Sequence, residues 1–315
     1  MTMREEFLWT EIYRPRVIDD CVLPLELKKT FKKFVSDRVI PNLLLSGTAG
    51  TGKTTVARAM LDELDCDSII INGSMNGNID TLRNDIRNFA GTMSMAGGRK
   101  YVILDEADYL NPNSTQPALR NFMEEFSNNC GFILTCNFKN RIIAPLHSRC
   151  SVIEFKIPSK EKASLAGEFL ERACGVLEKQ NVTFDKKVVA ELIMKHFPDW
   201  RRVLNEMQRY GASGSIDAGI LAQVADVDIK DLIKALRDKD FATMRKWVGI
   251  NSSMDVNTLF RRLYDAAYDI VDKSTIPNFV LILADYQYKS AFVVDQEINT
   301  AACMTQIMVD CEFRK

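Results

Sequence analysis

Residues 47–54 read Gly-Thr-Ala-Gly-Thr-Gly-Lys-Thr, and their spacing fits the phosphate-binding pattern GxxxxGK[ST]. Glycines let successive backbone N–H groups face phosphate oxygens, and the helix expected after them adds the positive end of its dipole. Lys53 would reach the β- and γ-phosphates, and the Thr54 hydroxyl would ligate Mg²⁺. A glycine-rich turn is the alternative. The residues expected at the phosphates are Gly47, Thr48, Ala49, Gly50, Thr51, Gly52, Lys53, Thr54 and Thr55.

An acidic pair, Asp105-Glu106, ends the apolar run in the stretch YVILDEAD at residues 101–108. At the end of a strand beside the phosphates, Asp105 would hold Mg²⁺ through water. Glu106 would polarise the attacking water as a general base. An acidic cap at the start of a helix is the alternative. Together the two motifs predict hydrolysis of a nucleoside triphosphate, and they leave open what the energy drives.

A third apolar run, GFILTCN, ends in Asn137. A polar residue at the tip of a strand beside the magnesium-holding strand could position the attacking water near the γ-phosphate. An asparagine in a turn is the alternative interpretation. The arrangement requires the three motifs to meet at one edge of a sheet.

Alternating strand-like and helical stretches over residues 1–158 predict the sheet that would bring these motifs together. Such alternation is typical of a parallel sheet covered by helices. Pro158-Ser159 interrupts the pattern, and helical periodicity follows over 159–225 and again over 226–315. The fold class expected is therefore an α/β P-loop NTPase followed by two helical domains. The strand-like runs are 42–46, 68–71, 101–104, 131–136 and 152–155.

The composition argues against several other classes of protein. The net charge is −1, so bulk charge gives no indication of nucleic acid binding. Eight cysteines without a CxxC pair and only two histidines disfavour a zinc site or a histidine triad. Apolar runs are too short to cross a bilayer, and no export signal is apparent. We expect a cytoplasmic protein with reduced thiols and no membrane partner.

The order of these motifs resembles the AAA+ ATPases of sliding-clamp loaders, the small-subunit family of replication factor C, over about residues 7–210. Details such as NGS and SGSIDAGIL most resemble the clamp-loader ATPases of T4-like bacteriophages. A phage-encoded protein of this kind would be located in the cytoplasm of the host. Phe197-Pro198 stands where the family commonly has glycine. The segments that carry the resemblance are LWTEIYRPRVIDD, NIDTLRNDIRNFA, QPALRNFMEEFSNNCGFILTCN, RIIAPLHSRC and FPDWRRVLNEMQ.

The resemblance implies an AAA+ nucleotide-binding domain at 1–158, a helical lid at 159–225 and a helical oligomerisation collar at 226–315. In the family the first arginine of the lid motif, here Arg201, contacts the γ-phosphate. The N-terminal box of the family packs against adenine. The residues that match it here are Tyr13, Arg14, Pro15 and Ile18.

Arg149 lies in the stretch PLHSRC, and no acidic residue three or four places away could pair with it along a helix. In the family the arginine of Ser-Arg-Cys is an arginine finger that projects into the ATP site of the next subunit and stabilises transition-state charge. Arginine suits this role because its planar fork can donate two hydrogen bonds to one phosphate. A surface or intra-subunit ion pair is the alternative.

Arg83 and Arg87 are four residues apart and share a helix face that would suit sequence-independent contacts to DNA phosphates. A solvated helix face is the alternative. Arg141, after the Asn137 strand, is a second DNA candidate. Gln116 and Arg120 match positions that link the nucleotide site to the DNA face in the family, although both could be structural.

The function implied by the resemblance is that of an ATP- and Mg²⁺-dependent clamp-loader subunit. ATP binding would assemble a ring-like, pentameric complex of copies of this chain with a non-identical subunit, which opens a sliding clamp and grips primer–template DNA. Hydrolysis would then release the clamp. The alternative is an AAA+ DNA-remodelling motor or a helicase-type ATPase. A helicase would need a second motor domain and a junction motor a winged-helix domain, whereas residues 226–315 show only helical periodicity.

Overall fold

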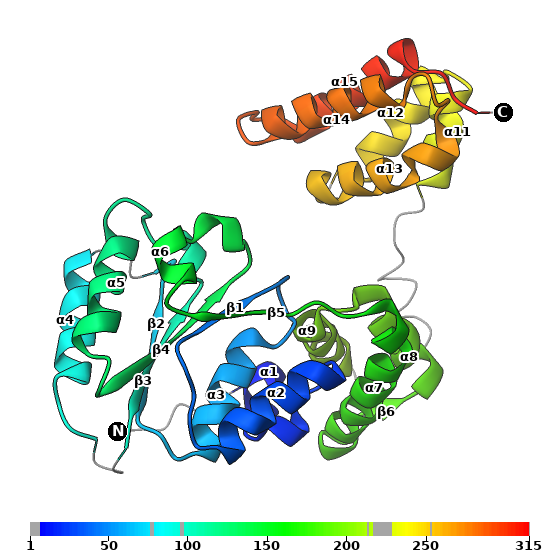
Figure 1. Cartoon of the computed structure of the whole chain (residues 1–315). Coiled ribbons are helices and arrows are strands. Elements are labelled where there is room, and N and C mark those ends of the chain that lie inside the picture. The colour runs from blue at the N-terminus through cyan, green and yellow to red at the C-terminus, as the bar shows by residue number, and fades with distance from the viewer. Residues whose placement is uncertain are drawn as a thin grey trace. The chain divides into compact units, whose positions relative to one another are not determined.

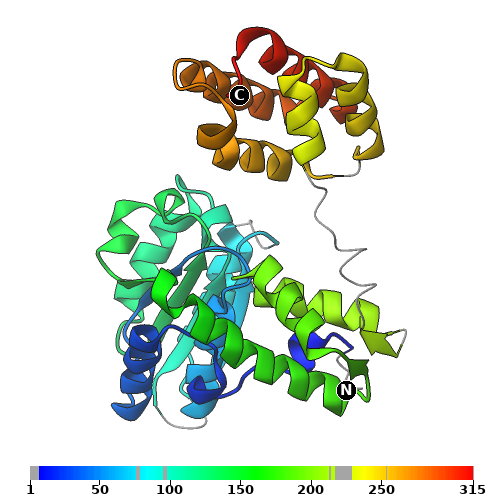
Figure 2. The same cartoon turned by 90° about the vertical axis from the view of Figure 1, so that its right-hand side faces the viewer.

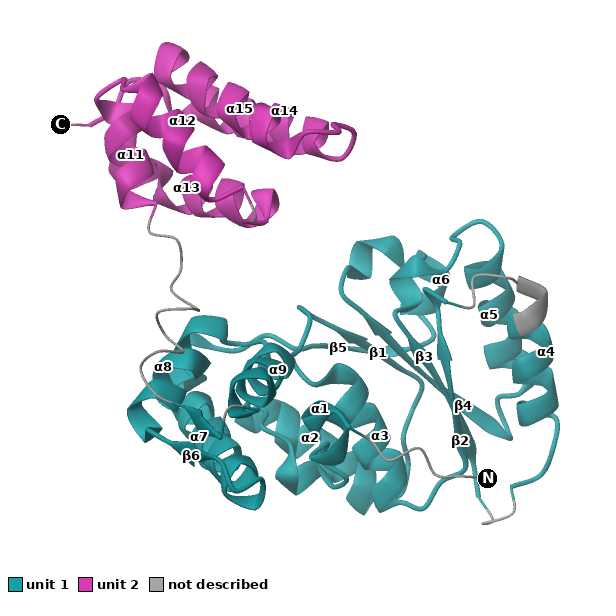
Figure 3. Cartoon of the chain, turned by 180° about the vertical axis from the view of Figure 1, so that it is seen from behind, with its two compact units in different colours: residues 1–223 teal, residues 224–315 magenta. Residues whose placement is uncertain are grey.

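The computed structural model describes residues 7–75, 79–94, 98–212, 214–216, 229–252 and 254–314. The chain divides into two compact units, unit 1 at residues 1–223 and unit 2 at residues 224–315 (Figure 3). The predicted boundary between residues 225 and 226, and most of the stretch SGSIDAGIL, lie outside the described residues.

Unit 1 contains a five-stranded parallel sheet in the order β2-β3-β4-β1-β5 (Figure 1). All five strands were predicted to within one residue at either end. This agreement follows from the long apolar runs that a parallel sheet needs, because both of its faces are covered. The strands are β1 (Leu43–Ser46), β2 (Ser68–Asn72), β3 (Lys100–Asp105), β4 (Cys130–Cys136) and β5 (Ser151–Glu154).

Side chains of successive strand residues alternate between two buried cores, one on each face of the sheet. Leu43 and Leu45 pack in the core that contains Phe31, whereas Leu44 packs in the opposite core with Phe122. The first core is covered by helices α2 (Leu25–Ser36) and α3 (Lys53–Glu63), and the second by α4 (Ile79–Ala90) and α5 (Thr115–Glu125).

The strand order places β4 between the strand that precedes the phosphate motif and the strand that carries the acidic pair. Ser46 at the end of β1 pairs with Cys136 of β4, and Leu104 of β3 pairs with Leu134. The carboxyl ends of the three strands therefore meet at one edge, where ligands of parallel sheets bind. Residues between β3 and β5 add η2 (Ala107–Tyr109), η3 (Lys139–Arg141) and α6 (Ala144–His147).

The lid region of unit 1 is helical, as predicted from its apolar periodicity. Its residues Leu165, Phe169 and Leu192 are buried. The N-terminal helix α1 (Trp9–Ile12) lies against the lid helix α9 (Figure 2). There the Trp9 N–H donates to Gln208 Oε1 at 2.9 Å. The elements after β5 are η4 (Ser159–Glu161), α7 (Lys162–Lys179), β6 (Thr183–Phe184), α8 (Lys186–His196), α9 (Trp200–Gly211) and β7 (Ser215–Ile216).

Helices also make up unit 2 over its described residues, with Leu263, Phe279 and Ile307 in the core. Side chains of Asp240 and Asp255 cap the N-termini of two of these helices by accepting backbone N–H groups. No helix in the described ranges of the chain has the length and apolar character of a membrane span. The helices are α11 (Lys230–Arg237), α12 (Phe241–Ile250), α13 (Val256–Ile270), α14 (Ile276–Ser290) and α15 (Gln296–Asp310).

Candidate nucleotide-binding site

The predicted phosphate loop connects β1 to α3, and two of its glycines adopt backbone conformations that favour glycine. Gly50 and Gly52 have φ of +73° and +92°, which side-chain-bearing residues rarely adopt. A Cβ atom on Gly50 would also lie 1.7 Å from Oδ1 of Asp199, at the start of the lid helix α9. The backbone N–H of Trp200 donates to the Gly50 carbonyl at 3.2 Å. The lid therefore contacts the phosphate loop directly.

Lys53 is 8% exposed, and its ammonium group joins the phosphate loop to the neighbouring strand. Nζ donates to the carbonyls of Gly47 and Thr48, both at 2.8 Å, and to Oδ1 of Asn137 at 2.9 Å. Burial lowers the pKa of Lys53, and the charge of Asp105 partly offsets that effect. Lys53 and Asn137, predicted from separate motifs, thus lie in direct contact.

Thr54 and Asp105, the two predicted metal ligands, are also adjacent. The Thr54 hydroxyl donates to Oδ1 of Asp105 at 2.6 Å. A hydroxyl and a carboxylate are the hard oxygen donors that Mg²⁺ prefers, and in phosphate sites Mg²⁺ uses few protein ligands besides the phosphates and water. These residues therefore fit the magnesium ion that the sequence predicts.

Glu106, the predicted general base, adopts a left-handed backbone conformation with φ +55° and ψ +44°. This conformation is uncommon for a residue other than glycine and tends to occur at functional sites. The next acid, Asp108, is buried and accepts the backbone N–H groups of Asn137 at 3.2 Å and Phe138 at 3.1 Å. Asp108 therefore ties the acidic segment to the end of β4, a role that the sequence analysis did not consider.

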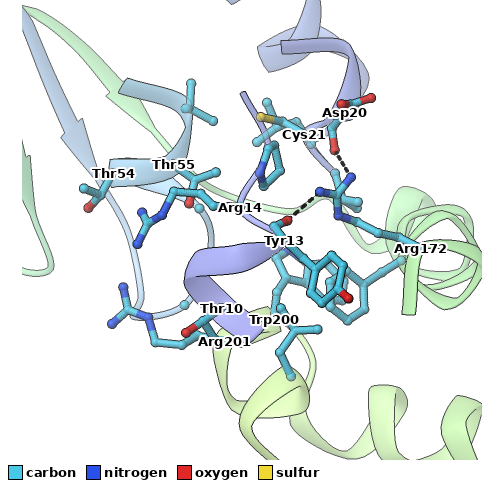
Figure 4. A pocket seen from close by; sticks show the side chains of 18 of the residues that line it. Thr10, Tyr13, Arg14, Asp20, Cys21, Thr54, Thr55, Arg172, Trp200 and Arg201 are labelled. Atoms are coloured by element: carbon cyan, nitrogen blue, oxygen red, sulfur yellow. Dashed lines mark hydrogen bonds between the residues drawn. The ribbon is translucent and has the colours of Figure 1, made fainter. Parts of the chain in front are cut away.

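A pocket lies between the N-terminal segment, the phosphate loop and the lid (Figure 4). Tyr13, Arg14 and Pro15 line it, as the resemblance implies for the adenine side. Ile18 was placed with them but does not line the pocket. It is 1% exposed in the core, and its backbone N–H donates to Oε2 of Glu63 at 2.9 Å.

The lid helices supply pocket residues that the sequence analysis missed. Arg172 of α7 donates to the carbonyl oxygens of Tyr13 at 2.8 Å and Asp20 at 3.1 Å, which ties the N-terminal segment to the lid (Figure 4). Trp200 stacks on Phe169 with ring centroids 4.4 Å apart, and both line the pocket. Their helical pattern predicts burial and carries no signal of a pocket. Arg201, predicted for the γ-phosphate, is exposed and also lines the pocket.

Arg149 has a partner within the chain, contrary to the expectation from its local sequence. Its Nε donates to Oε1 of Glu124 at 3.0 Å, Nη2 contacts the same oxygen, and Nη1 donates to the Pro145 carbonyl at 2.9 Å. The hydrogen bonds from Arg149 lower the pKa of Glu124. Both side chains are accessible to water, at 31% and 58% exposure, so the pair adds little to stability. Glu124 is 25 residues away in sequence, which is why local spacing missed it.

Cys150 follows Arg149 directly in the chain. The residue is half-buried and packs against the core beneath α5. Burial raises the pKa of its thiol to about 12, which keeps the sulfur protonated at neutral pH.

Gln116, one of the two predicted coupling residues, is fully buried and bridges two segments. Its Nε2 donates to the carbonyls of Leu110 and Arg141, both at 3.0 Å, and its Oε1 accepts the Ile143 N–H at 2.8 Å. It thus joins the segment after the acidic pair to a segment predicted to reach DNA. Arg120 is exposed, and it donates to Oδ1 of Asn121, the next residue on α5, at 3.4 Å.

The three arginines predicted to contact DNA are all exposed. Arg83 and Arg87 lie on α4, and the Arg87 guanidinium also lies 5.7 Å from the centre of the Phe122 ring. Arg141 lies over the Phe138 ring at 4.7 Å, just beyond the end of β4.

Two family models match unit 1. One is described as "ATPase family associated with various cellular activities (AAA)" and matches residues 43–157. The other is "Sliding-clamp-loader large subunit, AAA+ ATPase lid domain" and matches residues 161–222. A solved structure of the Thermotoga maritima RuvB Holliday junction branch migration motor has a TM-score of 0.51 at 17% identity, covering 71% of this chain and 78% of that one. The chain is an AAA+ P-loop ATPase.

Similarity to individual proteins shows which group of AAA+ ATPases the chain belongs to. The chain is 38% identical over 272 residues to the sliding-clamp-loader large subunit of Escherichia phage RB69, covering 85% of this chain and 84% of the relative. It is 33% identical to that of Enterobacteria phage T4 over 98% of both. It is 34% identical to the replication factor C small subunit of Archaeoglobus fulgidus, over 81% of this chain and 84% of that relative. The chain belongs to the family of sliding-clamp-loader ATPase subunits, which confirms the resemblance and the fold class.

Proposed function

We propose that this chain is the ATPase subunit of a sliding-clamp loader in DNA replication. The observation that carries the proposal is that four side chains predicted for phosphate, metal and water, from three separate segments, meet at one edge of the sheet. Lys53 contacts Asn137, and Thr54 contacts Asp105. Intact contacts of this kind speak against a catalytically silent scaffold subunit. The full-length similarity to the phage T4 clamp-loader subunit supports the same conclusion.

Each side chain at this edge has a defined task in ATP hydrolysis. The backbone of residues 47–52 and the ammonium of Lys53 bind the phosphates. Thr54, directly, and Asp105, through water, would hold Mg²⁺, and the ion would neutralise charge on the phosphoryl oxygens. Glu106 accepts a proton from the attacking water, and Asn137 orients that water. Tyr13, Arg14 and Pro15 enclose the base at the other end of the pocket.

Arg149 completes the site of a neighbouring subunit in this proposal. Its exposed ion pair with Glu124 is easily exchanged, since water screens both charges. The guanidinium could therefore transfer from its own carboxylate to the phosphates of the next chain on assembly. Arg201 of the lid would contact the γ-phosphate within the same chain. Hydrolysis would then depend on assembly, as expected for a clamp loader that acts only as a complex.

The proposed assembly is a ring-like pentamer of copies of this chain and a non-identical subunit, held together by the domain at 226–315. It would open a sliding clamp when ATP is bound and release it on primer–template DNA after hydrolysis. Arg83, Arg87 and Arg141 would track the DNA phosphates, and Gln116 would link that face to the acidic segment. The lid is assigned to 159–225 and the nucleotide-binding domain to 1–158.

The test is the ATPase rate of the full chain, assembled with its partner subunit, with and without a cognate sliding clamp and primer–template DNA. We expect clamp and DNA together to raise the rate well above that with either alone. A rate indifferent to the clamp, accompanied by duplex unwinding, would overturn the proposal in favour of a helicase-type ATPase. A rate stimulated only by branched DNA would favour a DNA-remodelling motor.

A further inference from the structure

Thr135 is a buried threonine near the end of β4, 2% exposed, whose hydroxyl contacts both members of the acidic pair. Oγ1 donates to Oδ1 of Asp105 at 2.6 Å and accepts the backbone N–H of Glu106 at 3.2 Å. A hydroxyl has one donor and two acceptor positions, so both bonds form at the same time.

The bond to Glu106 stabilises an unfavourable backbone conformation. Glu106 has φ +55°, and a residue other than glycine keeps such a conformation only where its surroundings hold it. The β3–β4 ladder ends with the pair Leu104–Leu134, so Glu106 lies beyond the last strand pair. The side chain of Thr135 continues the link between the two strands by one more hydrogen bond. It therefore fixes the direction in which Glu106 leaves the sheet.

The bond to Asp105 fixes the carboxylate independently of the phosphate loop. Asp105 Oδ1 also accepts the Thr54 hydroxyl, but Thr54 is itself a proposed ligand of Mg²⁺ and must be free to exchange partners. Thr135 is buried and has no such second task. Hydrogen bonds to a metal-holding carboxylate commonly tune both metal affinity and activity.

We propose that Thr135 is a positioning residue for ATP hydrolysis, whose hydroxyl holds Asp105 and Glu106 in register at the end of the sheet. The inference rests on the roles proposed for those two acids. It does not depend on the sliding clamp, because it concerns hydrolysis by the assembled complex without clamp or DNA, and metal-dependent nucleotide binding by the chain.

The experiment compares three substitutions in the full chain. Thr135→Val removes the hydroxyl at nearly constant volume, and Thr135→Ser keeps it. Thr115→Val is the matched control, because Thr115 is equally buried and its Oγ1 has no hydrogen-bond partner among the described residues. Basal ATPase of the assembled complex, without clamp or DNA, is measured against Mg²⁺ concentration, and the affinity for a fluorescent ATP analogue is measured in Mg²⁺ and in EDTA.

For Thr135→Val we expect kcat to fall about 10- to 100-fold and the half-saturating Mg²⁺ concentration to rise, as for the loss of other outer-shell hydrogen bonds. Affinity in EDTA should stay within about twofold, because the hydroxyl does not contact the phosphate loop. Thr135→Ser should restore most of the rate and the Mg²⁺ dependence. Thr115→Val should behave as the unmodified chain.

Three results would overturn the proposal. Thr135→Val could show an unchanged Mg²⁺ dependence, Thr135→Ser could be as defective as Thr135→Val, or affinity in EDTA could fall in parallel with the rate, which would indicate a packing role. If Thr135→Val does not fold, Thr135→Ala carries the same expectations. Failure of the clamp-loading proposal would be seen separately, because the ATPase rate of the unsubstituted protein would then not respond to the clamp.

Discussion

The two halves of the proposed catalytic centre differ in how the chain holds them. The inner half consists of Lys53, Thr54, Asp105 and Asn137, joined by hydrogen bonds of 2.6 to 2.9 Å at the edge of the sheet. The outer half is Arg149, whose exposed guanidinium rests on a carboxylate of its own chain. The inner half is thus held by close contacts within the chain, whereas the proposed finger makes only an exposed, weak ion pair that phosphates of a neighbouring subunit could replace.

The largest effect should come from the inner half. Lys53→Ala removes the ammonium that binds phosphate and contacts Asn137, so we expect ATP binding to weaken and stimulated hydrolysis to fall to background. The measurement is ATP affinity and ATPase rate of the assembled complex. Lys29→Ala is the control, because Lys29 lies in an exposed ion pair with Glu26 on α2. Hydrolysis that survives Lys53→Ala would place the phosphate site elsewhere.

Arg149→Ala should separate the two halves. Removing an arginine finger costs about 10³- to 10⁵-fold in kcat, so stimulated hydrolysis of the complex should collapse. ATP affinity of the isolated chain should stay near normal, because Arg149 does not line its own pocket. Both quantities are measurable on the same protein.

Mixing the Lys53→Ala and Arg149→Ala chains is the sharpest form of this test. Some interfaces in the mixture pair an intact phosphate loop with an intact finger, so part of the activity should return. If the two chains co-assemble and no activity returns, the finger does not act across subunits.

A smaller effect is expected from the two arginines of α4 that are proposed to contact DNA. Arg83→Ala with Arg87→Ala should weaken binding evenly across DNA sequences and reduce the salt dependence of log K by about 2, roughly one for each lost phosphate contact. Arg261→Ala is the control, because Arg261 is an exposed arginine of unit 2. An unchanged salt slope, measured by fluorescence anisotropy at several salt concentrations, would remove both arginines from the DNA site.

The smallest effect should come from Glu124→Ala, which frees the finger from its own chain. Glu124 competes only weakly with the phosphates of the next subunit for Arg149, because the ion pair is exposed. We therefore expect stimulated hydrolysis at limiting subunit concentration to rise by no more than about fivefold. Glu125→Ala, at the adjacent exposed position, serves as the control. A loss of activity as large as that of Arg149→Ala would instead show that Glu124 aims the arginine.

Sequence reasoning identified the inner half because phosphate and metal chemistry permit few residue types at few spacings. The same reasoning located all five strands, since a parallel sheet buried on both faces needs uninterrupted apolar runs. It grouped Ile18 with its neighbours in the N-terminal box, whereas the Ile18 side chain lies in the core and does not line the pocket. Adjacent residues of an irregular segment can face opposite ways, and no periodicity reveals which.

Contacts between segments that are distant in the sequence could not be predicted. Arg172 meets Tyr13 across 159 residues, and Arg149 meets Glu124 across 25. Both arginines look like ordinary surface charges in their own helical or loop context. Their partners follow only from the way the lid and α5 pack on the sheet, which is a property of the whole fold.

The contact between Gly50 and the lid has a mechanical consequence. Because the Gly50 carbonyl accepts the Trp200 N–H and a Cβ on Gly50 would overlap Asp199, we expect movement of the loop at Gly50 to shift the first turn of α9 as well. That turn also carries Arg201. A bound phosphate group that changes the conformation of the loop would therefore also change the orientation of α9. Nucleotide binding would in this way alter the position of the lid helix.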